Sequence, residues 1–156
     1  MWLGLLGGWL AAGGLAWVEQ VRRDPPEFAA SADLLSARFG FCPEGDSPDC
    51  VVDGDTFWFK GAKYRIADID APETHGPACA EEGALGARAT RRLRALLDAG
   101  PFSLARGDRD TDFYGRALRI VVRDGQSIGD MLVAEGLARR WDGRRHPWCG
   151  KAVSGS

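Results

Sequence analysis

The chain has 156 residues, of which 45% are hydrophobic and 27% are charged, so it can form one compact domain with an appended segment. Its net charge of −2 at pH 7 excludes a strongly basic protein of the kind that commonly binds nucleic acids. The charges are unevenly distributed. Residues 40–80 contain eight acidic and three basic side chains, whereas residues 81–149 contain thirteen arginines and ten acidic side chains. This asymmetry suits a site for a cation and a phosphate, although a mixed-charge surface is the simpler alternative.

Residues 1–18 contain no charged side chain, and as a helix they would reach about 27 Å, close to the thickness of a bilayer core. We interpret them as a signal peptide or a membrane anchor, with a buried core helix as the alternative. Prolines, glycines and serines in residues 19–50 predict a linker, with a possible short helix over residues 28–38. Residues 51–149 form the predicted folded domain, and residues 150–156 form a tail.

Four cysteines follow the apolar segment, which makes disulfide bonds plausible and favours the cell envelope or the exterior as the location. Of the three possible pairings we favour Cys42–Cys50, which closes a loop before the first strand, together with Cys79–Cys149, which ties the end of the domain to an earlier loop. Reduced thiols are the first alternative. A zinc site is the second, but the chain has no CxxC pair.

The domain is predicted to begin with strands over residues 56–59 and 63–70, which are separated by a turn at Gly61. Pro72 cannot donate a ladder hydrogen bond, so the second strand should end at Asp70. Arg65 and Asp70 would then face opposite sides of one regular strand. If both serve one site, the strand must bend or end before Asp70.

The remainder predicts a helix over residues 80–99, because leucines and alanines recur on one face until Gly100 and Pro101 end it. Strands follow over residues 102–106 and 116–123. Ser127 and Asp130 form a capping box for a short helix that ends near Gly136, and residues 137–141 form a last strand. The predicted fold class is mainly β with helices (α+β), a five-stranded Greek-key barrel of the OB type with one longer and one short helix, preceded by the apolar segment.

The most informative stretch is residues 51–74, because its paired strands would gather three carboxylates and one guanidinium. These are Asp55, Arg65, Asp70 and Glu73. Carboxylate oxygens suit a hard divalent cation, and planar guanidinium groups can bind a phosphate through two hydrogen bonds. Taken singly, each residue has a structural explanation as a turn former, a strand end or a partner in an ion pair.

Three blocks of this sequence resemble the motifs of the thermonuclease family, whose type member is staphylococcal nuclease. They are VDGDT at residues 52–56, RIADIDAPET at residues 65–74, and DFYGR at residues 112–116. The blocks occur in the family's order, and the similar region covers roughly residues 51–141. The resemblance implies a calcium-dependent phosphodiesterase on a five-stranded OB barrel, with DNA and RNA as substrates.

The resemblance also implies roles for individual residues. Asp55 and Asp70 would bind Ca²⁺ through their carboxylates, and Ala71 would contribute its carbonyl oxygen. Glu73 would orient or deprotonate the attacking water.

Two arginines, Arg65 and Arg116, would bind the scissile phosphate, and Tyr114 would help to hold a neighbouring phosphate. Two departures from the type member affect substrate binding. Phe113 stands where that protein has a lysine, and residues 142–145 do not reproduce its tyrosines.

The sequence therefore predicts a monomeric catalytic domain that hydrolyses DNA, RNA or both with Ca²⁺. It would be secreted, periplasmic, or tethered to the membrane if the first segment is not removed. The main alternative is a non-catalytic OB-fold module that binds nucleic acid at the membrane. A glycosidase with paired carboxylates is a third possibility, which Arg65 and Arg116 disfavour.

Overall fold

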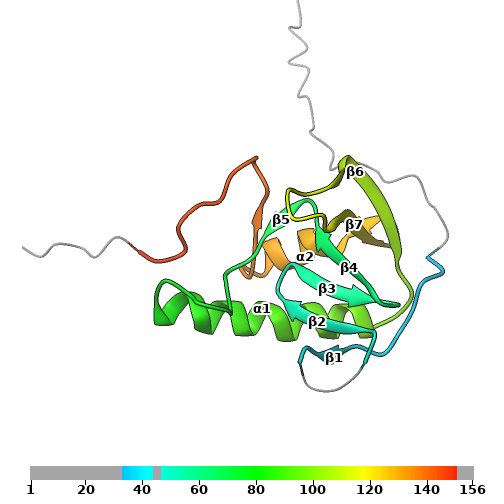
Figure 1. Cartoon of the computed structure of the whole chain (residues 1–156), viewed down its shortest axis with the longest axis horizontal. Helices are drawn as coiled ribbons and strands as arrows, with labels where there is room; N and C mark the ends of the chain where they lie inside the picture. The colour runs from blue at the N-terminus through cyan, green and yellow to red at the C-terminus, as the bar shows by residue number, and fades with distance from the viewer. Residues whose placement is uncertain (1–32, 44–46, 151–156) are drawn as a thin grey trace, which may run out of the picture.

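A computed structural model describes residues 33–43 and 47–150, shown in colour in Figure 1. Within these residues the structure has two helices and a mixed β-sheet, as the sequence predicts. The helices are α1 (Ala80–Asp98) and α2 (Ile128–Ala134). The strands are β1 (Gly40–Phe41), β2 (Cys50–Asp53), β3 (Thr56–Phe59), β4 (Ala62–Ile66), β5 (Ile69–Asp70), β6 (Ser103–Thr111), β7 (Ala117–Arg123), β8 (Gln126–Ser127) and β9 (Arg139–Arg140).

The main sheet has the order β1-β2-β3-β4-β7-β6, with β8 paired to β7, and a separate small sheet pairs β5 with β9. Among the described residues, the five strands with four or more residues are β2, β3, β4, β6 and β7, and each remaining strand has two residues. Neighbours pair antiparallel except β1–β2 and β4–β7, which are parallel. The sheet is open between β1 and β6, and its arrangement is consistent with an OB-like fold.

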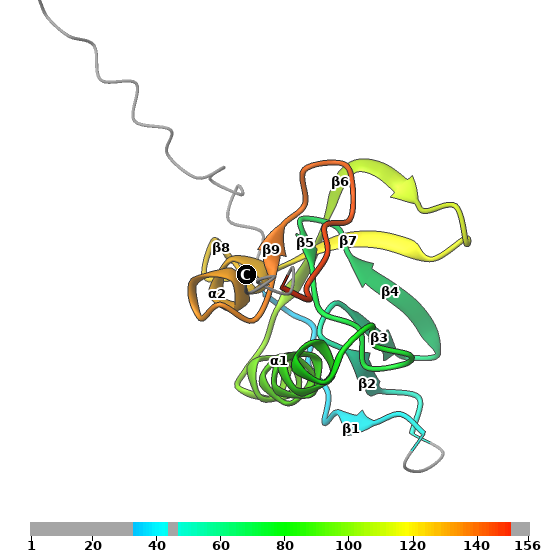
Figure 2. The same cartoon turned by 90° about the vertical axis from the view of Figure 1, so that its left-hand side faces the viewer.

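The long helix α1 packs against β2, whereas α2 packs against β7, β9 and β5 (Figures 1 and 2). One face of α1 is buried through Ala89, Leu93, Leu96 and Leu97, which explains why a helical apolar pattern appears in the sequence. At α2, Ser127 is the N-cap, and its Oγ accepts a hydrogen bond from the Asp130 backbone N–H at 3.3 Å. The predicted capping of this helix is confirmed.

The core contains an aromatic cluster that includes a residue from the predicted linker. Phe39 is only 2% exposed and its ring lies 6.0–6.2 Å from the rings of Phe57, Phe59 and Phe102. Residues 33–38 are not helical, and Leu35 instead exchanges backbone hydrogen bonds with Phe102. For these residues the predicted helix over 28–38 is wrong, because pairing with the start of the β6 region satisfies the same backbone groups.

The predicted bend after Arg65 is present. Strand β4 ends at Ile66, a turn occupies Ala67 and Asp68, and β5 begins at Ile69. The parity conflict between Arg65 and Asp70 therefore disappears, because the two side chains belong to different strands.

Both predicted disulfides are present, Cys42–Cys50 and Cys79–Cys149. Since all four cysteines lie in the described residues, the alternatives of free thiols and of a cysteine-ligated zinc do not hold in this structure. The apolar segment at residues 1–18 lies outside the described residues. Among the described helices, none combines the length and the apolar character that a membrane crossing requires.

Candidate active site

The site begins with two buried carboxylates from different parts of the fold. Asp55 lies in the turn between β2 and β3, Asp70 ends β5, and each residue is 4% exposed. The Asp55 carboxylate accepts hydrogen bonds from the Thr56 hydroxyl at 2.9 Å and from the Ala71 backbone N–H at 3.0 Å. The second bond joins the β2–β3 turn to the end of β5, so the three predicted cation ligands Asp55, Asp70 and Ala71 lie together.

Arg65 on β4 contacts both carboxylates and is only 7% exposed. One guanidinium nitrogen, Nη1, donates to the carbonyl oxygens of Ile66 at 2.9 Å and Ile69 at 3.1 Å, across the turn between β4 and β5. The other, Nη2, lies 3.3 Å from an Asp55 carboxylate oxygen and 3.4 Å from one of Asp70. Arg65 thus fixes the backbone turn and partly neutralises both carboxylates.

A second cationic group comes from the loop between β6 and β7. Asp112 accepts hydrogen bonds from the backbone N–H groups of Tyr114 and Arg116, each at 2.9 Å, and from Arg116 Nε at 2.6 Å. Burial alone would raise the pKa of Asp112, but the hydrogen bonds from Arg116 outweigh it and lower the pKa below its ordinary value. The Arg116 guanidinium also lies 5.5 Å from the centre of the Tyr114 ring. The loop is therefore built around one carboxylate that orients Arg116.

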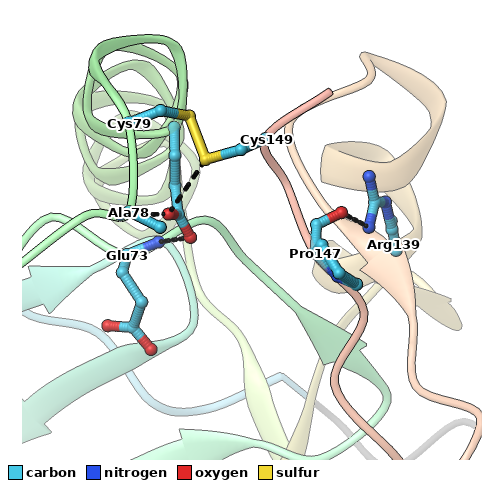
Figure 3. The surroundings of a disulfide bond; sticks show 7 residues. Glu73, Ala78, Cys79, Arg139, Pro147 and Cys149 are labelled. Atoms are coloured by element: carbon cyan, nitrogen blue, oxygen red, sulfur yellow. Dashed lines mark hydrogen bonds between the residues drawn. A yellow bond between two sulfur atoms is a disulfide. The ribbon is translucent and has the colours of Figure 1, made fainter. Parts of the chain in front are cut away.

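These parts meet in an open groove of about 810 Å³, which is lined by Arg65, Glu73, Tyr114 and Arg116. Figure 3 shows that the Glu73 backbone lies near the start of α1, while its carboxylate points away from that helix. The backbone N–H of Glu73 donates to Glu82 Oε1 at 3.4 Å, which anchors the segment after β5 to α1. The predicted catalytic and phosphate-binding residues therefore line one groove, and Arg65 connects this groove to the predicted cation ligands Asp55 and Asp70.

One residue of the site was not predicted from the sequence. Arg145 lines the same groove, forms an ion pair with the Glu73 carboxylate, and has its Nε 3.7 Å from Asp70 Oδ1. It lies in an irregular segment without hydrophobic periodicity, so no pattern places it near residue 73. The only sequence feature that indicates this approach is the predicted Cys79–Cys149 pairing, which brings the segment back toward the start of α1.

The electrostatics of the carboxylates indicate an excess of negative charge. Burial and the nearby Asp55 carboxylate raise the pKa of Asp53 to about 7. Burial also raises the pKa of Asp70, the charge of Asp55 adds to the increase, and Arg145 and Arg65 oppose it. Buried carboxylates that repel one another are suited to a hard cation with oxygen ligands, so the residues present fit calcium.

The structure combines an OB-like fold with buried carboxylates beside two oriented arginines. Residues 63–149 match the model of the family described as staphylococcal nuclease homologue. The chain belongs to the staphylococcal nuclease family. Asp55 lies outside the matched residues, so its place in the site rests on its contacts with Arg65 and Ala71.

Three relatives are similar to part of the chain. It is 39% identical to endonuclease YncB of Bacillus subtilis (strain 168) in an alignment of 98 positions, and the match covers 58% of this chain and 45% of the relative. It is 40% identical over 98 residues to the SPbeta prophage-derived endonuclease YokF of the same organism, covering 58% of this chain and 32% of the relative. An uncharacterized endonuclease of Haemophilus influenzae (strain ATCC 51907 / DSM 11121 / KW20 / Rd) is 30% identical over 110 residues, 70% of this chain and 54% of the relative. The chain thus spans between about a third and about half of these relatives.

Proposed function

We propose that the protein is a calcium-dependent phosphodiesterase that hydrolyses DNA, RNA or both. The observation that carries this proposal is that Arg65, which contacts the buried carboxylates of Asp55 and Asp70, lines one groove with Glu73 and Arg116. Membership of the nuclease family and the endonuclease names of three relatives support the same activity.

Each part of the groove has a chemical task in this proposal. Asp55, Asp70 and the carbonyl oxygen of Ala71 would hold the calcium ion, which supplies a Lewis acid for a phosphoryl oxygen. Glu73 accepts a proton from the attacking water at a carboxylate oxygen. Arg65 and Arg116 bind the scissile phosphate and stabilise the negative charge that develops on its oxygens.

Arg65 and Arg116 are prepared for this task in different ways. Arg65 is fixed by two backbone carbonyls, so its position depends on the turn between β4 and β5. Arg116 is oriented through Nε by Asp112, which leaves the outer edge of its guanidinium directed to the groove that it lines. Tyr114, which is 80% exposed beside Arg116, would contact a phosphate next to the scissile one.

The proposal is tested by measuring cleavage of single-stranded DNA, duplex DNA and RNA by the full chain, with Ca²⁺ and with EGTA. We expect cleavage only with Ca²⁺. Glu73→Ala should lower the rate by about 10²–10⁴-fold because it removes the general base. Arg116→Ala should lower it by about 10²–10³-fold because it removes a preorganised donor.

Glu81→Ala is the matched control for Glu73→Ala, because Glu81 is an exposed carboxylate in the first turn of α1. Its rate should equal that of the unmodified chain. Undiminished cleavage by Glu73→Ala would exclude the proposed mechanism. Binding of nucleic acid without cleavage at any calcium concentration would favour the non-catalytic module instead.

We also propose an oxidising compartment as the place of action, in the cell envelope or outside the cell. The two disulfides support this location, because such bonds persist in oxidising surroundings and are rare in the cytosol. An uncharged apolar stretch at residues 1–18 supports it as a signal peptide or anchor. Fractionation of cells that express the full chain tests the location, and recovery of the folded protein only from the cytosol would contradict it.

A further inference from the structure

The segment after β9 folds back across the carboxylate site and is fixed at both ends. At its start, the Trp141 backbone N–H donates to the carbonyl oxygen of Asp68 at 2.9 Å. At its end, Cys149 is joined to Cys79 at the beginning of α1, with the two Cα atoms 6.0 Å apart. Figure 3 shows this bridge between the helix and the C-terminal segment. The chain from residue 142 to residue 148 therefore spans the site as a strap.

The last three residues of this strap are held by Arg139 of β9. Its Nη1 donates to the carbonyl oxygens of Pro147 at 3.0 Å and His146 at 3.4 Å, and its guanidinium lies 3.8 Å from the centre of the Trp148 ring. These contacts, together with the disulfide, leave little freedom for the neighbouring backbone. They determine where the Arg145 side chain lies.

Arg145 reaches from the strap to the catalytic carboxylates. Its guanidinium forms an ion pair with Glu73, and its Nε is 3.7 Å from Asp70 Oδ1. The Arg145 side chain is 51% exposed, in contrast to Arg65, whose side chain is 8% exposed. Arg65 is committed to fixed backbone carbonyls, whereas Arg145 can exchange its partner by rotating a long side chain at the solvent boundary.

Charge considerations indicate which partner Arg145 would take when substrate is bound. In the absence of substrate Arg145 forms an ion pair with the carboxylate of Glu73, the proposed base. To accept a proton, this carboxylate must be released from the ion pair. A phosphodiester backbone brings further negative charges into the groove that Arg145 shares with Arg65 and Arg116. Planar guanidinium groups bind phosphate through two parallel hydrogen bonds, so a phosphate can replace the carboxylate of Glu73.

We propose that Arg145 is a substrate-binding residue of this nuclease: it pairs with Glu73 in the absence of substrate and transfers to a backbone phosphate of bound nucleic acid. The Cys79–Cys149 bridge and the contacts of Arg139 hold the strap so that this transfer occurs at the site. The inference rests on the proposed function and adds to it a binding residue from a segment that departs from the type member's tyrosines.

The test measures binding separately from cleavage. The probe is a fluorescein-labelled single-stranded DNA oligonucleotide, and fluorescence anisotropy is recorded with the full chain in EGTA over a series of salt concentrations. Arg145→Gln should weaken binding about tenfold. It should also reduce the slope of log K against log salt by about 0.7, the value expected for one lost phosphate contact on a single strand.

Arg144→Gln is the matched control, because it removes the same charge one residue away, from an exposed side chain that does not line the groove. It should change the affinity less than twofold. Replacing Cys79 and Cys149 by serine should weaken binding as Arg145→Gln does, and combining the two changes should add little, because both act through the position of one guanidinium.

The outcomes separate this inference from the proposed function. Arg145→Gln with the affinity and salt slope of the unmodified chain would overturn the assignment of Arg145, as would an equal loss in Arg144→Gln. Binding that depends on Arg145 in a chain that never cleaves with Ca²⁺ would support this residue and contradict the nuclease activity. A chain that binds no oligonucleotide in EGTA would overturn the assignment of Arg145, and the cleavage assay with Ca²⁺ would then decide the proposed activity by itself. Thermal unfolding checks that each variant is folded. If the serine variant does not fold, the result for Arg145→Gln alone decides whether Arg145 binds the substrate.

Discussion

Asp112 is the residue on which the orientation of Arg116 depends. It accepts two backbone hydrogen bonds in the β6–β7 loop and the 2.6 Å bond from Arg116 Nε. A neutral amide at this position would keep the size of the side chain but lose its charge and one acceptor atom. In the proposed mechanism Asp112 is therefore a positioning residue, since it orders the arginine that would bind the phosphate.

Asp112→Asn should lower kcat by about 10–100-fold with little change in KM, because hydrogen bonds to charged groups contribute about 1.5–3 kcal/mol. Steady-state cleavage kinetics measure both parameters. The matched control is Asp110→Asn, which removes a more exposed carboxylate from β6 that pairs with Arg119. A rise in KM with unchanged kcat would show that Asp112 serves substrate binding and not the transition state.

The site residues that belong to a sequence motif could be predicted from the sequence. A residue that reaches the site only through the tertiary fold could not. Asp55, Arg65 and Asp70 lie within one hairpin and the strand that follows, so local pairing brings them together. Arg116 follows from a separate motif. Arg145 depends on a disulfide that links positions 70 residues apart, and no local pattern in the sequence encodes that approach.

At the level of elements, α1 packs against the backbone that carries Glu73, the proposed base. A Cβ atom added to Gly86 would lie 2.8 Å from the Pro72 carbonyl oxygen and 2.9 Å from that of Glu73. The helix therefore packs directly against the backbone that carries the proposed base. Gly54, between Asp53 and Asp55, is equally close to the helix, with an added Cβ atom 2.6 Å from Ala89 Cβ.

Gly86→Ala should lower the free energy of unfolding by about 1–3 kcal/mol, because the helix must move away from rigid backbone. The same displacement should lower kcat/KM, since Glu73 moves with its carbonyl group. Chemical denaturation and cleavage kinetics measure the two effects.

Gly83→Ala in the same helix is the control for this change. Its added Cβ atom would contact only the Pro77 ring, at 3.1 Å and 3.6 Å. The higher helix propensity of alanine, about 1 kcal/mol, should then leave stability unchanged or improve it. If Gly86→Ala were as stable and as active as Gly83→Ala, the close packing of α1 on the site would be refuted.

Elements with a strong pattern were predicted closely, and short ones were not. The range predicted for α1 differs from the observed one by a single residue, since its buried face has a clear period. Strand β6 continues to Thr111, five residues beyond its predicted end, because its last four residues are exposed and carry no apolar alternation. Of the two-residue strands, β5 and β9 fall within the longer strands predicted over residues 63–70 and 137–141, whereas β1 and β8 were not predicted.

At the scale of the whole molecule, the start of the folded domain that composition predicts, residue 51, is later than the start that the structure shows. The prolines and glycines of residues 19–50 predict a linker, yet Phe39 joins the aromatic core and β1 pairs with β2. One buried aromatic ring and two strand residues hardly change the composition of residues 19–50, so composition does not reveal that part of this segment is folded. The Cys42–Cys50 disulfide then fixes this early segment against β2.

The two disulfides should differ in their contributions to stability, since they close loops of very different length. Cys79–Cys149 joins positions 70 residues apart, whereas Cys42–Cys50 joins positions 8 apart. The loop-entropy relation gives about 4 kcal/mol for the longer loop and about 2.5 kcal/mol for the shorter one. Each pair is replaced by serines in the full chain, and chemical denaturation of the two variants is compared with that of the unmodified chain.

We expect the loss of Cys79–Cys149 to lower the free energy of unfolding more, and to weaken oligonucleotide binding as well, because it releases the strap that carries Arg145. Loss of Cys42–Cys50 should lower stability without affecting binding, since Cys50 begins β2, Cys42 follows β1, and none of the described residues between them lines the groove. The shorter loop is therefore the control for the longer one. Equal binding losses in the two variants would show that the disulfides act through general stability and not through the position of Arg145.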